Sequence, residues 1–131
     1  MTEHFLTYEQ SLAVKELGFD EPCLAWHVSK EHGLEIGQVY ERDLIKDAVI
    51  APLKSQFFKW VREKYNLRGF IGFRLDVKQF DCHIYDMSLS GLEYVKQRTM
   101  KEYNKDTLVG TYEQAEDACI NKIIQILKEK I

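Results

Sequence analysis

The sequence predicts an α+β domain in the order α-β-β-α-β-β-α, with an antiparallel four-stranded sheet and helices packed on one face. Three observations predict it. Three segments repeat apolar residues at the three- and four-residue spacing of an amphipathic helix, and shorter segments between them alternate as strands do. The 131 residues suit a single domain, residues 1–131, and 45% of them are hydrophobic, enough for a core.

The first helix is predicted to begin after Thr7 and to run through Leu17. Thr7 can cap the first turn, and Gln10, three residues later, can reach back to form a capping box. Gly18 tolerates the left-handed conformation that ends a helix, and Phe19 follows where a Schellman motif places an apolar contact.

Two strands are predicted next. Residues 23–28 form the first, with one face made by Leu24, Trp26 and Val28 and the other by Cys23, Ala25 and His27. Residues 31–33 read as a hairpin turn into a more polar strand at 35–40. Residues 41–51 fit either a short helix or an irregular loop.

The second helix is predicted to start at Ala51-Pro52, with proline in the first turn. Its apolar stripe is Leu53, Phe57, Trp60, Val61 and Tyr65, and Asn66 is its C-cap. A half-buried strand follows at 70–77, in which Ile71, Phe73, Leu75 and Val77 alternate with polar or small residues. Residues 78–81 are predicted to turn into a fourth strand at 82–88.

Residues 89–110 remain undecided between strand, short helix and loop. Thr111–Gln114 then opens the last helix, whose stripe is Tyr112, Ala115, Cys119, Ile123 and Leu127. The tetrapeptide Thr-Tyr-Glu-Gln occurs at both 7–10 and 111–114. A relic of duplication is one explanation, but we favour one capping solution used twice, because the capping box explains its Thr and Gln.

Charge is distributed unevenly along the chain. The formal net charge is −3, from 18 basic and 21 acidic residues, and this acidic balance argues against a general nucleic-acid binder. Residues 1–51 carry four basic and ten acidic residues, residues 52–74 six and one, and residues 75–131 eight and ten. The basic middle is therefore the electrostatic asymmetry that points to a partner.

Cysteine usage and hydropathy predict a soluble cytoplasmic protein with no membrane partner. Cys23, Cys82 and Cys119 lie far apart among apolar residues, which favours buried thiols in a reducing compartment over a disulfide framework. The N-terminal residues are too few and too acidic for a signal peptide. No apolar run approaches the roughly 20 residues that span a bilayer.

Three segments carry a resemblance to known proteins: Tyr8–Cys23 (YEQSLAVKELGFDEPC), Ala51–Leu67 (APLKSQFFKWVREKYNL) and Thr111–Lys130 (TYEQAEDACINKIIQILKEK). Together they resemble a family of small uncharacterised proteins encoded by bacteriophages and prophages of gut anaerobic bacteria. The resemblance covers somewhat under half the chain. It implies small size, a cytoplasmic location and a phage or mobile-element origin, and it carries over no activity and no site residue.

The residues capable of metal or nucleophilic chemistry form no recognisable motif. The available metal ligands are Cys23, His27, Cys82, His83 and Cys119. Cys23 and His27 share a strand face, but Cys82 and His83 are adjacent and point to opposite faces, and no pair has zinc-finger spacing. A trio of Cys82, His27 and Asp86 could be imagined for nucleophilic catalysis, but there is no nucleophile elbow, P-loop or dinucleotide glycine motif.

The carboxylates of one predicted hairpin are Asp76, Asp81 and Asp86. We assign Asp81 to the turn, and Asp76 and Asp86 to solvent or to a pair with Arg74. A two-metal nuclease would need a further ligand placed by the fold. The sequence therefore predicts a protein that is not an enzyme and that uses no cofactor and no metal.

The basic helix at 54–68 is the clearest positive signal. Its cations are Lys54, Lys59, Arg62, Lys64 and Arg68, and its aromatic residues are Phe57, Phe58, Trp60 and Tyr65. Cations beside aromatic rings suit phosphate contact and base stacking. A solvated helix face explains the same cations, and apart from Phe58 the rings belong to the stripe predicted to pack on the sheet.

The sequence thus favours a protein-interaction module that binds another protein or itself as a homodimer. The acidic first third, the basic helix and two aromatic residues expected to be exposed, Phe58 and Tyr94, support it. The expected partner-binding residues are Lys54, Phe58, Lys59, Arg62 and Arg68. The alternative is a weak nucleic-acid-binding protein that uses the basic helix 54–68.

Overall fold

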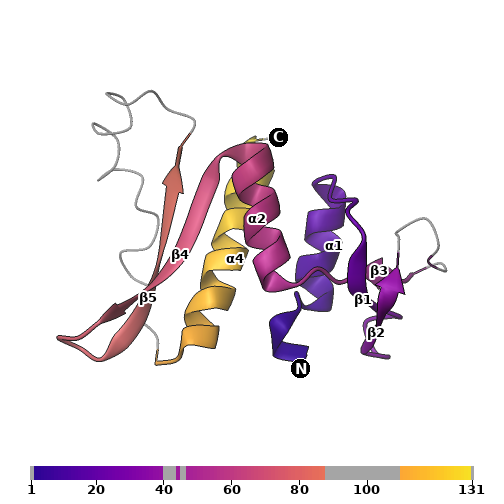
Figure 1. Ribbon diagram of the computed structural model, residues 1–131, viewed down its shortest axis with the longest axis horizontal. Helices are drawn as coiled ribbons and strands as arrows, with labels where there is room; N and C mark the ends of the chain where they lie inside the picture. Colours follow the sequence, from indigo (N-terminus) through magenta and orange to yellow (C-terminus); the bar gives the residue numbers. More distant parts are fainter. Residues whose placement is uncertain (1, 40–43, 45–46, 88–109, 131) are drawn as a thin grey trace. The chain divides into compact units, whose positions relative to one another are not determined.

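The computed structural model describes residues 2–39, 44, 47–87 and 110–130. By its internal contacts the chain divides into two compact units, residues 1–57 and 58–131, and the division falls inside helix α2 (Lys54–Tyr65). Each unit has its own antiparallel sheet (Figure 1). The single domain expected from the length stays a prediction.

The chain is mixed α+β, as predicted, and the order of its elements roughly matches. The single four-stranded sheet is wrong, because the strands form a three-stranded sheet β2-β1-β3 and a two-stranded sheet β4-β5. Alternation along a strand identifies the strand and its faces, but it does not say which hairpins pair with each other. The additional strand β3 (Val49–Ile50) comes from the stretch that fitted a helix or a loop.

Helix α1 (Tyr8–Glu16), which follows a short 3₁₀ helix at Thr2–His4, begins as predicted and ends one residue before the predicted end, with Leu17 as its C-cap. The Gln10 N–H donates to Thr7 Oγ1 at 3.2 Å, and the Thr7 N–H donates to Gln10 Oε1 at 3.0 Å, which completes the capping box. At the other end Gly18 has a φ of 96°. The Phe19 N–H donates to the Val14 carbonyl at 3.0 Å, the long hydrogen bond of a Schellman motif.

We expect Thr7→Ala to lower the free energy of unfolding by about 1 kcal/mol, because it removes the oxygen that accepts from Gln10. Denaturant unfolding measures the change. Thr7→Ser keeps the hydroxyl and is the matched control. An equal loss in both variants would contradict the capping role.

The first sheet buries one of the two faces predicted for β1 (Cys23–His27), which pairs antiparallel with β2 (Leu34–Val39) and β3. Its buried side chains are Cys23, Ala25 and His27, whereas Leu24 on the other face is exposed. Ala25 joins a small cluster with Phe5 and Ala51, and α1 packs on β3. The predicted end of β2 at Tyr40 lies outside the described residues.

A buried histidine anchors the N-terminal segment of the first unit. His27 Nε2 lies 2.9 Å from the Leu6 carbonyl oxygen. Since a carbonyl only accepts, Nε2 carries the proton in this hydrogen bond. The Tyr8 ring packs edge-on against the imidazole at 5.9 Å, and the Leu6 N–H donates to the Pro52 carbonyl at 3.0 Å.

Helix α2 begins later than predicted. The Phe57 N–H donates to the Leu53 carbonyl at 2.9 Å, so the helix starts after Leu53 and Pro52 precedes it. Leu53 pairs with Phe5 in an isolated β-bridge, which holds this segment extended. The C-cap is confirmed, since Asn66 has a φ of 55°. The stripe is buried at Phe57, Trp60 and Val61 and half-buried at Leu53 and Tyr65.

The hairpin of the second unit is shifted from its predicted position. Strand β4 (Leu67–Arg74) pairs with β5 (Gln79–Asp86), and residues 75–78 form the turn. Leu75 and Val77, predicted to lie on a buried strand face, are therefore exposed in the turn. The alternating apolar residues continue into the turn, so the sequence pattern does not show where the strand ends. Lys78 lies in the left-handed region of the turn, at a φ of 54°.

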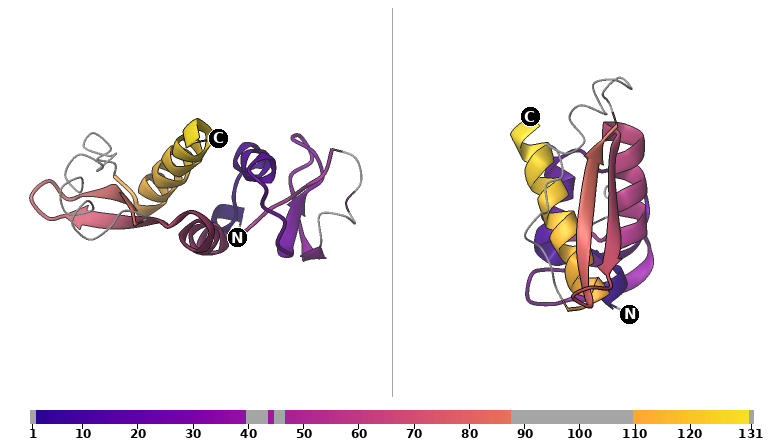
Figure 2. Two further views of the ribbon diagram at one scale, coloured as in Figure 1. Left: turned by 90° about the horizontal axis from the view of Figure 1, so that it is seen from above. Right: turned by 90° about the vertical axis from the view of Figure 1, so that its left-hand side faces the viewer.

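Helix α4 (Tyr112–Lys130) runs along one face of the β4–β5 hairpin (Figures 1 and 2). Its capping box is confirmed, with Gln114 N–H to Thr111 Oγ1 at 3.1 Å and Thr111 N–H to Gln114 Oε1 at 3.2 Å. Four of the five predicted stripe residues are buried: Ala115, Cys119, Ile123 and Leu127. Tyr112 is exposed, and Ile120, Ile124 and Ile126 widen the buried face.

Gly69 lets α4 and Phe58 approach β4 closely. A Cβ at this position would lie 2.9 Å from both Cys119 Sγ and Ile123 Cδ1, and 3.0 Å from Phe58 Cε1. On the same face of the hairpin Leu67, Cys82 and Ile84 are buried.

No helix in the described part of the chain is long and apolar enough to cross a membrane.

Candidate docking surfaces on the β4–β5 hairpin

The hairpin has an inner face, which α4 covers, and an outer face. Because side chains alternate along a strand, the outer face is formed by the residues between the buried ones. These are Arg68, Phe70, Gly72 and Arg74 of β4 and Gln79, Asp81, His83 and Tyr85 of β5. An outer face of a sheet is ordinarily polar, but this one carries three aromatic rings.

These three rings, the ring cluster, are Phe70, His83 and Tyr85. The Phe70 and His83 centroids are 5.0 Å apart at an interplanar angle of 18°, and those of Phe70 and Tyr85 are 5.5 Å apart at 22°. His83 and Tyr85 lie 6.4 Å apart and are inclined by only 4°. Phe70 is 49% exposed, so the cluster presents aromatic surface to solvent.

Gly72 makes room for the carboxylate that orients the imidazole of the cluster. Asp81 Oδ1 lies 3.0 Å from His83 Nε2, and a Cβ on Gly72 would lie only 2.6 Å from the same oxygen. Asp81 therefore belongs to β5 and bonds to His83, and its assignment to the turn is wrong. The displaced turn explains the error, because it moves Asp81 onto the strand.

The turn itself is held by an ion pair between Arg74 and Asp76, one of the two alternatives that the sequence left open for Asp76. Arg74 Nη2 donates to Asp76 Oδ2 at 2.6 Å and Nε to Oδ1 at 3.2 Å. This hydrogen bonding lowers the pKa of Asp76 and raises that of Arg74. Asp86, expected at solvent or beside Arg74, is instead buried on the inner face at the end of β5.

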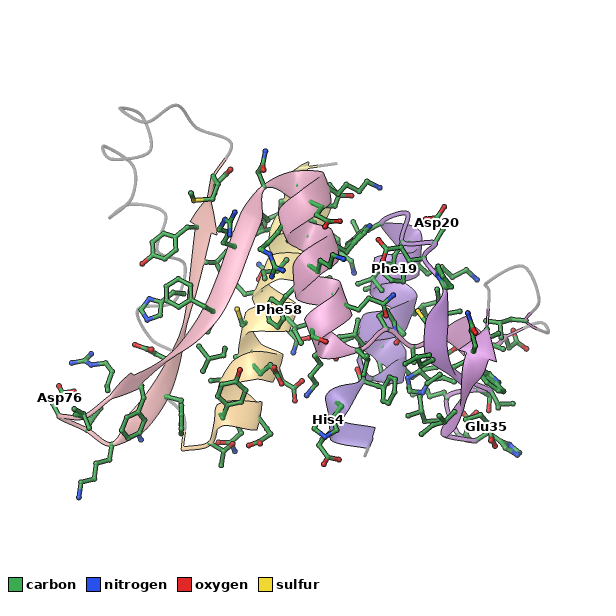
Figure 3. All side chains as sticks on the ribbon, viewed as in Figure 1. His4, Phe19, Asp20, Glu35, Phe58 and Asp76 are labelled. Atoms are coloured by element: carbon green, nitrogen blue, oxygen red, sulfur yellow. The ribbon has the colours of Figure 1, made fainter. Side chains whose placement is uncertain are left out.

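Three exposed apolar side chains, the apolar tip, lie at the end of the hairpin. Phe73, Leu75 and Val77 are 49%, 81% and 45% exposed. The Phe73 ring packs against Phe80 with centroids 4.9 Å apart, and Phe80 meets Tyr112 edge-on at 6.0 Å. Figure 3 shows Asp76 at this end of the hairpin. The tip is therefore braced by α4 at its base.

The predicted partner-binding residues differ in their exposure. Lys54 is only 5% exposed, and Phe58 (labelled in Figure 3) is half-buried beside Gly69. Lys59, Arg62 and Arg68 are exposed, and Lys59 Nζ lies 4.0 Å from Glu63 Oε1. Tyr94, expected to be exposed, lies outside the described residues.

The three cysteines are free and buried, as predicted. The structure brings Cys82 of β5 and Cys119 of α4 together, and the hydrogen bond between their thiols, together with burial, raises the pKa of Cys119. Such a thiol stays protonated and is a poor nucleophile. In the described part of the chain, no group of three His, Cys, Asp or Glu residues is placed to hold a metal ion.

Sequence reasoning missed the ring cluster because it followed only the apolar half of each alternating pattern. Phe70 occupies the position between Gly69 and Ile71, and His83 and Tyr85 alternate with Cys82 and Ile84. Aromatic residues at both sets of positions were the signal of a hairpin with two non-polar faces.

Comparisons with protein family models, with curated proteins and with solved structures found no match for this chain.

Proposed function

We propose that this chain is a non-enzymatic interaction module that docks the apolar tip of its β4–β5 hairpin into a protein partner. The observation that carries the proposal is the joint exposure of Phe73, at the end of β4, and of Leu75 and Val77 in the turn that follows it. Neighbouring exposed apolar side chains mark interaction surfaces, because their burial removes apolar area from water at about 25 cal/mol per Å². A concave apolar surface on another protein fits this projecting tip.

The construction of the hairpin favours binding. The ion pair between Arg74 and Asp76 holds the turn. The ring contacts of Phe80 with Phe73 and Tyr112 support the strands next to the turn. A loop that is already ordered loses less conformational entropy on binding than a flexible one. The tip therefore presents its side chains in a fixed arrangement.

The cellular setting belongs to the same proposal. Three buried free thiols support a reducing, cytoplasmic location. The resemblance of the segments at 8–23, 51–67 and 111–130 supports a phage or prophage origin.

We expect Leu75→Glu to abolish capture of the partner while leaving the thermal midpoint unchanged, because Leu75 is 81% exposed. The tagged full-length chain is incubated with nuclease-treated host lysate, and retained proteins are identified by mass spectrometry. Leu24→Glu is the matched control, since Leu24 is 53% exposed on a strand of the other unit. Partner capture by Leu75→Glu at the wild-type level would overturn the docking role of the tip.

Sedimentation of the purified chain distinguishes a second copy from a different protein. A concentration-dependent dimer that Leu75→Glu dissociates would identify the partner as another copy of the chain. A monomer at all concentrations, together with capture that depends on Leu75, would identify a heterologous partner. In such a dimer the same residues of both copies would be buried at the interface.

Nucleic-acid binding is the second candidate function, and the charge of the second unit favours it. Residues 58–131 carry 13 basic and 11 acidic residues, whereas residues 1–57 carry five and ten. Lys59 and Arg62 of α2 are exposed and accessible to phosphate. If α2 is the contact, the Lys59→Glu/Arg62→Glu double variant should not bind nucleic acid at low salt. At high salt the difference in affinity between this variant and the wild type should be smaller, because salt weakens binding by the wild type.

A further inference from the structure

We infer that the outer face of the β4–β5 hairpin is a binding site for single-stranded nucleic acid, with bases stacked on the ring cluster and a phosphate on Arg68. This site is separate from the apolar tip and from the exposed cations of α2. It would add a second ligand to a protein-docking module, and it does not depend on the docking role of the tip.

Phe70 is the ring of the cluster that is most open to a base, since it is 49% exposed whereas the His83 side chain is 22% exposed. Phe70, His83 and Tyr85 are inclined to one another by 18°, 22° and 4°, so their faces have nearly a common orientation. Strand β4 packs its inner face on α4, whereas Phe70 on its outer face remains 49% exposed. Unpaired bases stack on such rings with little dependence on sequence, because every base has an aromatic face.

The cluster is held in place before any ligand arrives. Asp81 bonds to His83 Nε2 at 3.0 Å and occupies the space above Gly72. This bond fixes the imidazole in its stacked orientation against Phe70. A fixed ring loses little entropy when a base stacks on it.

A cation stands beside the rings at the position where a phosphate would lie. Arg68 is two residues before Phe70 on the same face, about 6.6 Å along the strand, and it lies opposite Tyr85. Within the described residues its guanidinium makes no hydrogen bond or ion pair, whereas that of Arg74 is held by Asp76. Residues 58–131 carry 13 basic and 11 acidic residues, so their formal charge does not oppose the approach of a polyanion.

The decisive experiment measures binding of a 5′-labelled oligothymidylate of roughly 15 nucleotides to the full chain by fluorescence anisotropy at low salt. We expect Phe70→Ala to weaken binding about tenfold, through loss of stacking. Phe73→Ala is the matched control, since Phe73 belongs to the same strand and is also 49% exposed, but lies on the inner face. It should bind as the wild type does.

Two further variants separate stacking, charge and folding. Phe70→Leu keeps an apolar side chain but no flat ring, so it should lose affinity without losing thermal stability. Arg68→Ala should weaken binding and reduce the slope of log affinity against log salt by about one. These results would support the site on the outer face.

Four outcomes would overturn it. They are absence of binding at low salt, equal losses in the Phe70 and Phe73 variants, equally tight binding of a duplex of the same length, and a loss confined to the Lys59→Glu/Arg62→Glu double variant. The last would assign the contact to α2 instead. The docking role of the apolar tip is tested separately, by partner capture with Leu75→Glu.

Discussion

Ile123→Ala should lower the free energy of unfolding by about 2–5 kcal/mol, the usual cost of truncating a buried isoleucine to alanine. Ile123 is fully buried in the middle of α4, and its Cδ1 reaches the backbone of β4 at Gly69. The substitution leaves a cavity between the helix and the hairpin that neither the strand pairing nor the helix can close. Chemical denaturation followed by circular dichroism measures the loss.

Ile36→Ala is the matched control for this prediction. Ile36 lies on β2 and is 54% exposed, so the same change of side chain should alter stability by no more than about 0.5 kcal/mol. Similar losses in the two variants would contradict the placement of Ile123 in the core. The difference between them measures what burial contributes at the interface of α4 and β4.

Gly69→Ala is expected to destabilise the protein by about 1–3 kcal/mol, although alanine is ordinarily better tolerated than glycine in a strand. The added Cβ would lie at 2.9 Å from two side-chain atoms and 3.0 Å from a third, which is closer than packed atoms approach. The Cys119 and Ile123 side chains of α4 must shift away from β4, and the Phe58 ring must also give way. The midpoint of thermal unfolding should fall accordingly.

Two comparisons test this cause. Gly110→Ala adds the same methyl group at a position where, among the described residues, the nearest atom is Gln114 Oε1 at 3.9 Å, so it should be close to neutral. In an Ile123→Val background, which removes Cδ1, Gly69→Ala should cost less than it does alone, because neighbouring changes are not additive. Strictly additive losses would show that the crowding lies elsewhere.

Local signals in the sequence predicted the ends of helices well. The capping boxes at Thr7 and Thr111 and the positive φ values of Gly18 and Asn66 depend on residues within one turn, so a short window contains all the information. The start of α2 depends instead on a distant residue, since the bridge between Phe5 and Leu53 keeps the chain extended past Pro52. No local pattern records that pairing.

The candidate surfaces were less accessible to sequence reasoning. Lys54 looked like an exposed cation because charged residues rarely lie in a core, yet it is buried at the first turn of α2. Leu75 and Val77 looked like core residues because they continue an alternating pattern, yet they lie in the turn. Which polar residue is buried and which apolar residue is exposed is decided by tertiary packing, which composition does not reveal.

The position of α4 in the chain has a consequence for biosynthesis. The hairpin that it covers ends at Asp86, and the ribosome adds 44 more residues before α4 ends at Lys130. At about 5–20 residues per second this takes roughly 2–9 seconds. During that interval the inner face with Leu67 and Ile84 lacks its covering helix, and neighbouring nascent chains on a polysome can pair with it. Slow translation of the segment after β5 would therefore increase the need for chaperones.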